Sequence, residues 1–440
     1  MPMSNVLALL NLLLSTVLLV VLIRNIVRHG MRISTISLLV FVITNVIGIS
    51  FVPIILKKEL LNTGSVMLPF QPGAYTAQVI SAAIFVLASF CFLYISHHDS
   101  KLPSHLEMKR KMPGYLWFVG GFVFLIGVAL WLKYMLFGSG LNIALSTKYG
   151  FFDFSQSAAS RAEAKEILQA GQGYFRALIA SYSIFPLSVA MIRLFGRCKV
   201  FFFFTWTTGT ILSLLFAVST RQKAPPMIVI VCFIAILAVS EKQNARIKDI
   251  VRKRRRKRIV IGIVVVFLLS SFFYYVTQGE SFVISMQKVI LRIFVTPAAT
   301  AHLWYIAFPA RFPFQGISNV FLIRSPTAND GSAITIQDIA FETTGSVFSA
   351  NASFLAMGWS GLGYIGIFLG IIAFLSFLRI MDRATCRLNG LPMKLIFCLM
   401  IPGFPPLMSS SLMDMVFIGT IPAILFFALS LRVRIKGMNL

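Results

Sequence analysis

Acidic residues are scarce in this chain of 440 residues: Asp and Glu together number 14, and all four charged types make up only 12% of it. A soluble domain has roughly 25% charged and about 45–50% apolar residues. Here 58% of the residues are hydrophobic and the mean hydropathy is +0.85. This composition excludes a soluble enzyme with one apolar patch and indicates an integral membrane protein.

Cysteine and histidine are too few and too scattered for a disulfide framework or a metal cluster. The five cysteines fall in expected spans or cytosolic loops: Cys91, Cys198, Cys232, Cys386 and Cys398. The sequence contains no Walker loop, and its one glycine-rich stretch, Gly366-x-x-x-Gly370 with its neighbours, is typical of helix packing in membranes. We therefore expect neither a metal nor any other cofactor.

Long apolar runs recur along the chain, and a membrane-crossing helix needs about 20 such residues. They predict about eleven transmembrane helices, within a range of about 10–14. The runs lie near residues 4–23, 35–56, 74–96, 115–137, 173–192, 200–218, 225–240, 259–276, 351–378, 395–411 and 415–431. The expected fold is an all-α polytopic membrane protein that forms a single membrane domain over residues 1–440.

The net charge of +26 comes from 40 Lys and Arg, and in a soluble protein it would suggest nucleic acid. Most of these cations fall in alternate loops, above all in the loop at 241–258 with its run from Arg252 to Arg258. The positive-inside rule makes these loops cytosolic, with the N-terminus outside and the C-terminus in the cytosol. The charge then orients the helices, and we expect no nucleic-acid partner.

Two expected outer loops are too long to be simple connectors, since loops beyond about 12–15 residues are usually functional or disordered. The first covers 138–172 and the second covers 277–350; both are expected to contain short helices. The second includes an apolar stretch around His302 that is short and interrupted by prolines. That stretch fits a re-entrant or interfacial helix better than a span.

Seven cations lie on the expected outer side, against the positive-inside bias: Arg161, Lys165, Arg176, Arg221, Lys223, Arg292 and Arg311. A lipid diphosphate at the membrane surface is an anion that would explain their position. The alternative for Arg161 and Lys165, four residues apart on one helical face, is ordinary surface charge pairing. The alternative for Arg221 and Lys223, in a tight turn, is that they snorkel to the interface.

Four parts of the sequence together resemble the Wzy-type O-antigen polymerases, a family of polytopic inner-membrane glycosyltransferases. They are 160–166 with 171–174, 221–226, 292–297, and 351–354 leading to 361–366. The resemblance implies a C-type glycosyltransferase that uses neither a nucleotide sugar nor a metal. At the periplasmic face it would transfer a growing glycan from undecaprenyl diphosphate to the non-reducing end of a new undecaprenyl-diphosphate-linked repeat unit.

The same resemblance implies the bacterial inner membrane as the location. It also implies, as partners, membrane lipids and the chain-length regulator and flippase of the same pathway.

That reaction needs cations for the diphosphate leaving group and a base or orienting acceptor for the acceptor hydroxyl. We assign the diphosphate to Arg292, supported by the other outer cations, with Tyr149 as a residue that contacts sugar. His302, Asp338 and Glu342 are the candidates for the base, and the sequence leaves the choice open. His302 could equally be a packed interfacial residue, and Trp304 and Tyr305 could stack on sugars or belong to an aromatic belt.

Two alternative functions stay open. An O-antigen ligase would use the same architecture and donor but pass the glycan to the lipid A core, and His302 keeps this alternative open. A lipid-linked oligosaccharide flippase or other transporter would be expected to show internal repeats and charges deep within its spans. We find no such repeat, and the middles of the apolar runs are almost free of charge.

Overall fold

The computed structural model describes residues 3–29, 32–57, 68–99, 281–321, 334–346 and 351–385, with scattered residues between 125 and 275. Every element within these ranges is a helix, which confirms the predicted all-α class for the part of the chain described. The chain divides into two compact units, one of residues 1–105, 290–386 and 404–415, and one of 106–289, 387–403 and 416–440. Most of the described residues belong to the first unit.

Within the described residues, three helices are long and apolar enough to cross a membrane: α1 (Met3–His29), α5 (Pro72–Asp99) and α18 (Phe354–Thr385). They coincide with the predicted spans at 4–23, 74–96 and 351–378. A fourth is added if α14 (Phe282–Phe294) and α15 (Thr296–Ala307), which are bent by 48° at their junction, cross as one pair. The chain is therefore a helical membrane protein. Most of the other predicted spans lie outside the described residues.

α1 has an apolar outer face and a partly polar inner face, the reverse of an amphipathic helix in a soluble protein. Leu13 and Val20 are more than half exposed, whereas Asn11 is buried. The Asn11 side-chain amide donates to the Val46 carbonyl oxygen at 2.8 Å and to Ser50 Oγ at 2.9 Å. Hydrogen bonds of this kind hold membrane helices together, because lipid removes the hydrophobic driving force for their association.

The predicted span at 35–56 is interrupted rather than straight. It consists of α2 (Ile33–Phe41), the π-helical turn η1 (Val42–Val46), α3 (Ile47–Ile49) and α4 (Val52–Lys57). Where α3 ends, the Ser50 N–H donates to the Ile47 carbonyl instead of the Val46 carbonyl. The Val46 carbonyl is then satisfied by Asn11 of α1, which matters because lipid offers no hydrogen bonds.

α18 consists of two helices folded back on each other at Leu362 and Gly363, whose φ/ψ angles are not helical. In a straight helix Phe354 and Phe374 would lie about 30 Å apart, given a rise of about 1.5 Å per residue. Their ring centroids are 4.9 Å apart. Residues 354–361 therefore pack against the longer part, 364–385, as a hairpin. The longer part is about 33 Å long and could cross a membrane alone.

Glycine allows the two halves of this hairpin to approach closely. A Cβ on Gly366 would lie 2.0 Å from the Gly358 carbonyl oxygen, and one on Gly370 would touch the Phe354 ring at 3.5 Å. The predicted small-residue packing at these glycines is confirmed, but it occurs within one hairpin. The predicted span at 351–378 therefore contains a hairpin, because Gly363 turns the chain back.

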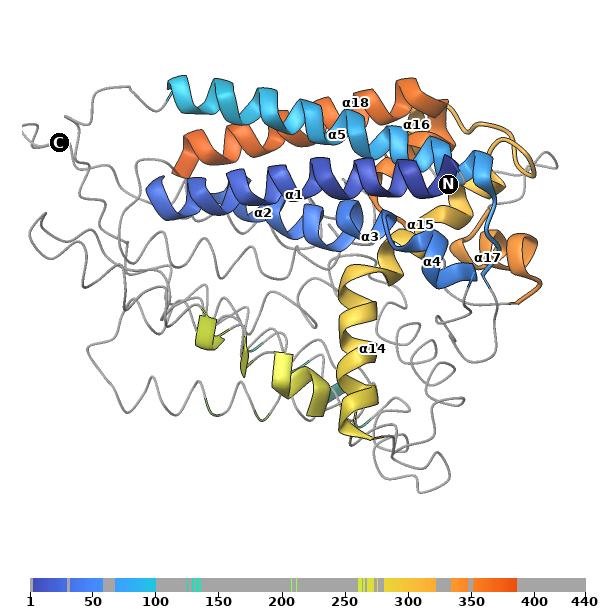
Figure 1. The fold of residues 1–440 in the computed structure, drawn as a ribbon, viewed down its shortest axis with the longest axis horizontal. Helices are drawn as coiled ribbons and strands as arrows, with labels where there is room; N and C mark the ends of the chain where they lie inside the picture. Colours follow the sequence, from blue (N-terminus) through green and yellow to red (C-terminus); the bar gives the residue numbers. More distant parts are fainter. Residues whose placement is uncertain are drawn as a thin grey trace, which may run out of the picture. The chain divides into compact units, whose positions relative to one another are not determined.

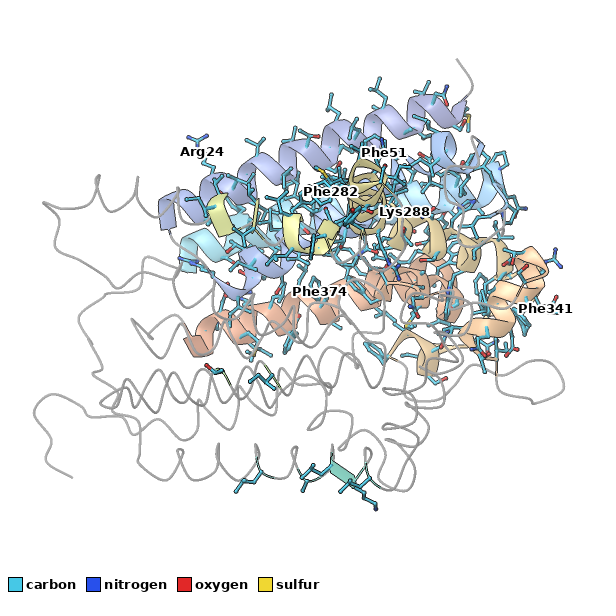
Figure 2. All side chains as sticks on the ribbon, turned by 90° about the horizontal axis from the view of Figure 1, so that it is seen from below. Arg24, Phe51, Phe282, Lys288, Phe341 and Phe374 are labelled. Atoms are coloured by element: carbon cyan, nitrogen blue, oxygen red, sulfur yellow. The ribbon has the colours of Figure 1, made fainter. Side chains whose placement is uncertain are left out.

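A core of four aromatic rings joins three helices of the first unit. Phe41 of α2 lies 4.8 Å from Phe85 of α5 and 4.9 Å from Phe354 of α18, measured between ring centroids. Phe374, labelled on α18 in Figure 2, completes the cluster at 4.9 Å from Phe354. Stacked and tilted aromatic pairs of this kind each add about 0.5–1.5 kcal/mol beyond the area they bury.

The helices α1, α2, α5 and α18 lie side by side, and the short helices gather at one end of them (Figure 1). At that end are the start of α5, α15, α16 (Ile317–Val320) and α17 (Ile336–Thr344). At the other end Asp382 near the end of α18 accepts hydrogen bonds from the Ser34 N–H, at 3.1 Å, and from the Ser34 hydroxyl. The described parts of two loops that are predicted to be cytosolic, at 24–34 and 379–394, thus lie together at that end.

Candidate functional site

The predicted site residues fall into two groups. Six lie outside the described residues: Tyr149, Arg161, Lys165, Arg176, Arg221 and Lys223. The other five all come from the expected outer loop at 277–350: Arg292, His302, Arg311, Asp338 and Glu342. Four of these five lie in or next to α15 and α17, two helices that contact each other.

Arg292 lies in the last turn of α14, one turn after Lys288, and its side chain is exposed (Figure 2 labels Lys288). A cation is favoured there by the helix dipole. Three residues later the chain bends into α15, and the bend packs against Gly48 of α3. A Cβ on Gly48 would lie 2.0 Å from the Phe294 carbonyl oxygen. This close backbone contact fixes the end of α14 that carries Arg292.

His302 of α15 is fully buried, and both its ring nitrogens are hydrogen-bonded. The Gln71 backbone N–H donates to Nε2 at 3.3 Å, and Nδ1 lies 3.1 Å from Gln78 Oε1. The Gln78 amide nitrogen donates to the Ala298 carbonyl at 2.7 Å, which leaves Oε1 to accept. The proton of the neutral ring is therefore assigned to Nδ1, since a backbone N–H already occupies Nε2.

These contacts favour the alternative in which His302 is a packed structural residue and not the catalytic base. The ring also stacks on Phe70, with 5.7 Å between centroids, and faces the edge of Tyr75 at 6.4 Å. A ring in this position cannot take a proton from a sugar hydroxyl without losing one of its two hydrogen bonds and opening the cluster around it. Its visible role is to join α15 to the start of α5.

The two glutamines that hold His302 were not singled out from the sequence. Gln78 carried a usable signal, because it is an uncharged polar residue inside the apolar run at 74–96. Polar side chains in such runs usually bond to another helix of the same protein. The Gln71 contact uses the backbone, so no side-chain pattern could have indicated it.

Asp338 closes the first turn of α17. Its Oδ2 accepts from the Thr335 N–H at 2.6 Å, and Thr335 Oγ1 accepts in return from the Asp338 N–H at 3.2 Å. This reciprocal arrangement is a capping box, which satisfies N–H groups that the first turn of a helix leaves free. Asp338 therefore has a structural contact that accounts for its carboxylate.

Glu342 lies one turn after Asp338 on the same helix, as the spacing predicted. Its Oε2 lies 3.8 Å from Nη1 of Arg311, and the two side chains are 45% and 50% exposed, respectively. Arg311 follows α15 and Glu342 belongs to α17, so the fold brings a cation and a carboxylate together from 31 positions apart in the chain. An ion pair this exposed is worth about 0–1 kcal/mol and exchanges its partners readily.

The aromatic residues at this end of the unit differ in their exposure. Trp304 and Tyr305 are 1% and 5% exposed and present no open face on which a sugar could stack. Phe314 and Tyr364, at 42% each, are the more accessible rings. Both lie against Trp359, with centroid distances of 5.8 and 5.1 Å.

Among the described residues, no group of three or more His, Cys, Asp or Glu side chains could hold a metal ion. Comparison of the chain with protein-family models, with curated proteins and with solved structures found no match.

Proposed function

We propose that this protein is an O-antigen polymerase of the C-type glycosyltransferase kind, with about eleven transmembrane helices in a bacterial inner membrane. Its N-terminus would be periplasmic and its C-terminus cytosolic. It transfers a growing glycan from undecaprenyl diphosphate to the non-reducing end of a new undecaprenyl-diphosphate-linked repeat unit. The pathway's chain-length regulator and flippase are the partners that this role implies.

The observation that carries the proposal is the Arg311–Glu342 pair. The reaction needs a cation at the diphosphate and a carboxylate at the acceptor hydroxyl, both accessible and close together. At 3.8 Å and half exposure, this pair supplies one of each at the end of the unit expected to face the periplasm. Arg292, exposed at the end of α14, is a further cation for the leaving group.

In the proposed step the bond between the anomeric carbon of the donor sugar and the diphosphate oxygen breaks, and the electron pair leaves with undecaprenyl diphosphate. A new bond forms between that carbon and the acceptor oxygen, whose proton passes to the Glu342 carboxylate. The arriving diphosphate competes with Glu342 for the Arg311 guanidinium. Because the exposed pair is weak, this exchange costs at most about 1 kcal/mol and frees the carboxylate for its role.

The lipopolysaccharide ladder of cells that depend on this chain tests the proposal. Loss of the chain should leave lipopolysaccharide capped with a single repeat unit. Arg311→Ala and Arg292→Ala should each shorten or abolish the ladder at normal protein levels, because losing a group that stabilises developing charge costs roughly 100-fold in rate. Arg24→Ala is the matched control, since Arg24 is exposed near the far end of α1 (Figure 2). Unchanged ladders in both site variants would contradict the proposal.

His302 kept the ligase alternative open, and this histidine is buried with both nitrogens hydrogen-bonded. The phenotype separates the two functions, because a ligase mutant leaves bare lipid A core without even a single repeat unit.

A transporter remains the second candidate, because the interrupted helix α18 is a feature of transporter binding sites. In such sites the ends of the half-helices hold the ion or substrate. Here the last two carbonyls of the helix 354–361 already accept backbone N–H groups of the chain itself, those of Gln315 and Gly316. Accumulation of unflipped, cytosolic-facing lipid-linked repeat units in cells without the chain would favour the transporter.

A further inference from the structure

The loop at 308–316, which carries Arg311, is fastened to the α18 hairpin at both ends. At its start the indole Nε1 of Trp359 donates to the Phe308 carbonyl at 2.8 Å. At its end two backbone N–H groups donate to the last two carbonyls of the helix 354–361, each at 2.9 Å: Gln315 to Ser360 and Gly316 to Gly361. The last carbonyls of a helix have no hydrogen-bond partner within that helix. The loop therefore supplies the N–H groups that these carbonyls need, and the same hydrogen bonds attach the loop to the helix.

The Trp359 ring is itself held in place on several sides. Tyr305 stacks on it with 5.3 Å between centroids, and Phe314 and Tyr364 meet it edge-on at 5.8 and 5.1 Å. Since Phe314 belongs to the loop, Trp359 contacts the loop near both ends, through a hydrogen bond at Phe308 and a ring contact at Phe314. A fixed indole therefore sets the separation of the two loop ends.

Arg311 lies between these anchors and has little backbone freedom of its own. Its N–H and that of Phe312 both donate to the Ala307 carbonyl, at 2.7 and 3.0 Å, so the chain turns tightly as α15 ends. With its backbone held on both sides, the loop sets the point from which the Arg311 side chain extends. From that point the guanidinium reaches Glu342 at 3.8 Å.

We propose that Trp359 is a positioning residue: by holding the loop at 308–316 it places the Arg311 guanidinium beside Glu342. It acts through Arg311 and touches no substrate. The placement of Arg311 follows from the contacts alone, whereas its consequence for binding the diphosphate rests on the proposed function. The experiment therefore measures placement and glycan synthesis separately.

Trp359→Phe removes the indole N–H and keeps an aromatic ring, and Tyr305→Phe is its matched control. That control removes a hydroxyl that bonds to Ser81 and keeps the ring that stacks on Trp359. In a chain whose five cysteines are replaced, spin labels are attached at the exposed positions 310 and 337, so that Arg311 and Glu342 stay in place, and the distance between the labels is measured in lipid nanodiscs. We expect a narrow distance distribution in the parent and in Tyr305→Phe, and a broad or shifted one in Trp359→Phe.

The second readout is glycan synthesis from lipid-linked repeat units by unlabelled chains with Arg311 and Glu342 in place. A misplaced Arg311 should lower kcat/KM for the donor by roughly tenfold in Trp359→Phe, the factor expected for one lost hydrogen bond, with the rate expressed per folded molecule. A purely structural defect would lower the amount of folded protein and leave kcat/KM per folded molecule unchanged.

A second variant keeps the test decisive if Trp359→Phe does not fold. A Cβ on Gly361 would lie 2.6 Å from Val320 Cγ2 and 2.9 Å from the Gly316 carbonyl oxygen, so Gly361→Ala should push the loop away from the hairpin. Gly73→Ala, where a Cβ would meet nothing within 4 Å, is its control. A distance distribution as narrow as the parent's in both Trp359→Phe and Gly361→Ala overturns the positioning role. If the parent itself makes no glycan, the proposed function fails while the distances still decide the role of Trp359.

Discussion

His302 lies on α15, whereas Arg311 lies in the loop after α15 and Glu342 on α17. The histidine and the ion pair differ in how far they are exposed and in whether their polar atoms are satisfied. His302 is fully buried and each of its nitrogens has a partner within hydrogen-bonding distance. Arg311 and Glu342 are about half exposed, and a long ion pair joins them. The first arrangement stabilises the fold and the second is available to a ligand.

The difference shows why residue type alone does not identify a site. A histidine and a glutamate are equally plausible bases by chemistry. What separates them here is whether the polar atoms are already satisfied, because a group whose hydrogen bonds are complete must lose some of them before it can act. Stability and activity should therefore respond differently when each region is altered.

The largest effect on stability is expected at the buried region. His302→Ala would leave the Gln71 N–H and Gln78 Oε1 unpaired and open a cavity, at a cost of about 2–4 kcal/mol in the free energy of unfolding. Thermal unfolding of the protein in detergent or nanodiscs measures this. The ladder should weaken only in proportion to the folded protein that remains.

His302→Phe sharpens the comparison, because it keeps the ring that stacks on Phe70 and removes both hydrogen bonds. It should cost about 1–3 kcal/mol, since the buried Gln78 Oε1 is left unsatisfied and the Gln71 N–H loses its partner. Gln337→Ala, at an exposed position on α17, is the control and should change stability little. A stable His302→Phe protein that makes no ladder would break the distinction and make His302 a catalytic candidate again.

Asp338 should give an intermediate effect. Asp338→Ala removes one side of the capping box and should cost about 0.5–2 kcal/mol, with a similar cost for Thr335→Ala. Because the two residues share one box, the double variant should cost less than the sum. Asp338→Asn keeps an acceptor oxygen and should retain both stability and ladder, as measured by thermal unfolding and by lipopolysaccharide gels. A lost ladder in a stable Asp338→Asn protein would make Asp338 the base.

The sequence predicts where helices lie along the chain better than it predicts where they bend. Apolar runs predicted α1 and α5 because length and hydropathy are local properties. The hairpin in α18 was missed, since the glycines that permit it, Gly358 and Gly366, also occur in straight helices that pack closely. The hairpin depends on a meeting of two backbones eight residues apart, which the apolar pattern does not reveal.

The candidate site could be predicted only as a set of residues. The spacing of Asp338 and Glu342 predicted one helical face, and the structure places both on α17. The pairing of Glu342 with Arg311 could not be predicted, because it depends on how α15 packs against α17. The capping role of Asp338 was in principle readable, since a Thr three residues before an acidic residue is a known helix start.

The smallest effect on stability is expected at the exposed pair, where the effect on the proposed activity should be largest. Glu342→Gln removes the charge and keeps the shape of the side chain. The free energy of unfolding should change by less than about 1 kcal/mol, because both partners are half exposed. Under the proposed function the rate of glycan transfer should fall by roughly 100-fold or more, as for loss of a general base. Thermal unfolding and the ladder together measure the two effects.

Exchanging the two residues separates a catalytic pair from a structural one. In the double variant Arg311→Glu with Glu342→Arg the ion pair can form again, so any role in holding α17 against the end of α15 is restored. The cation and the carboxylate have nevertheless changed places, and each would face the wrong part of the substrate. A double variant as stable as the parent but without a ladder would show that the two positions have separate tasks. A restored ladder would mean that the pair serves only to hold the fold, and that Glu342 is not the base.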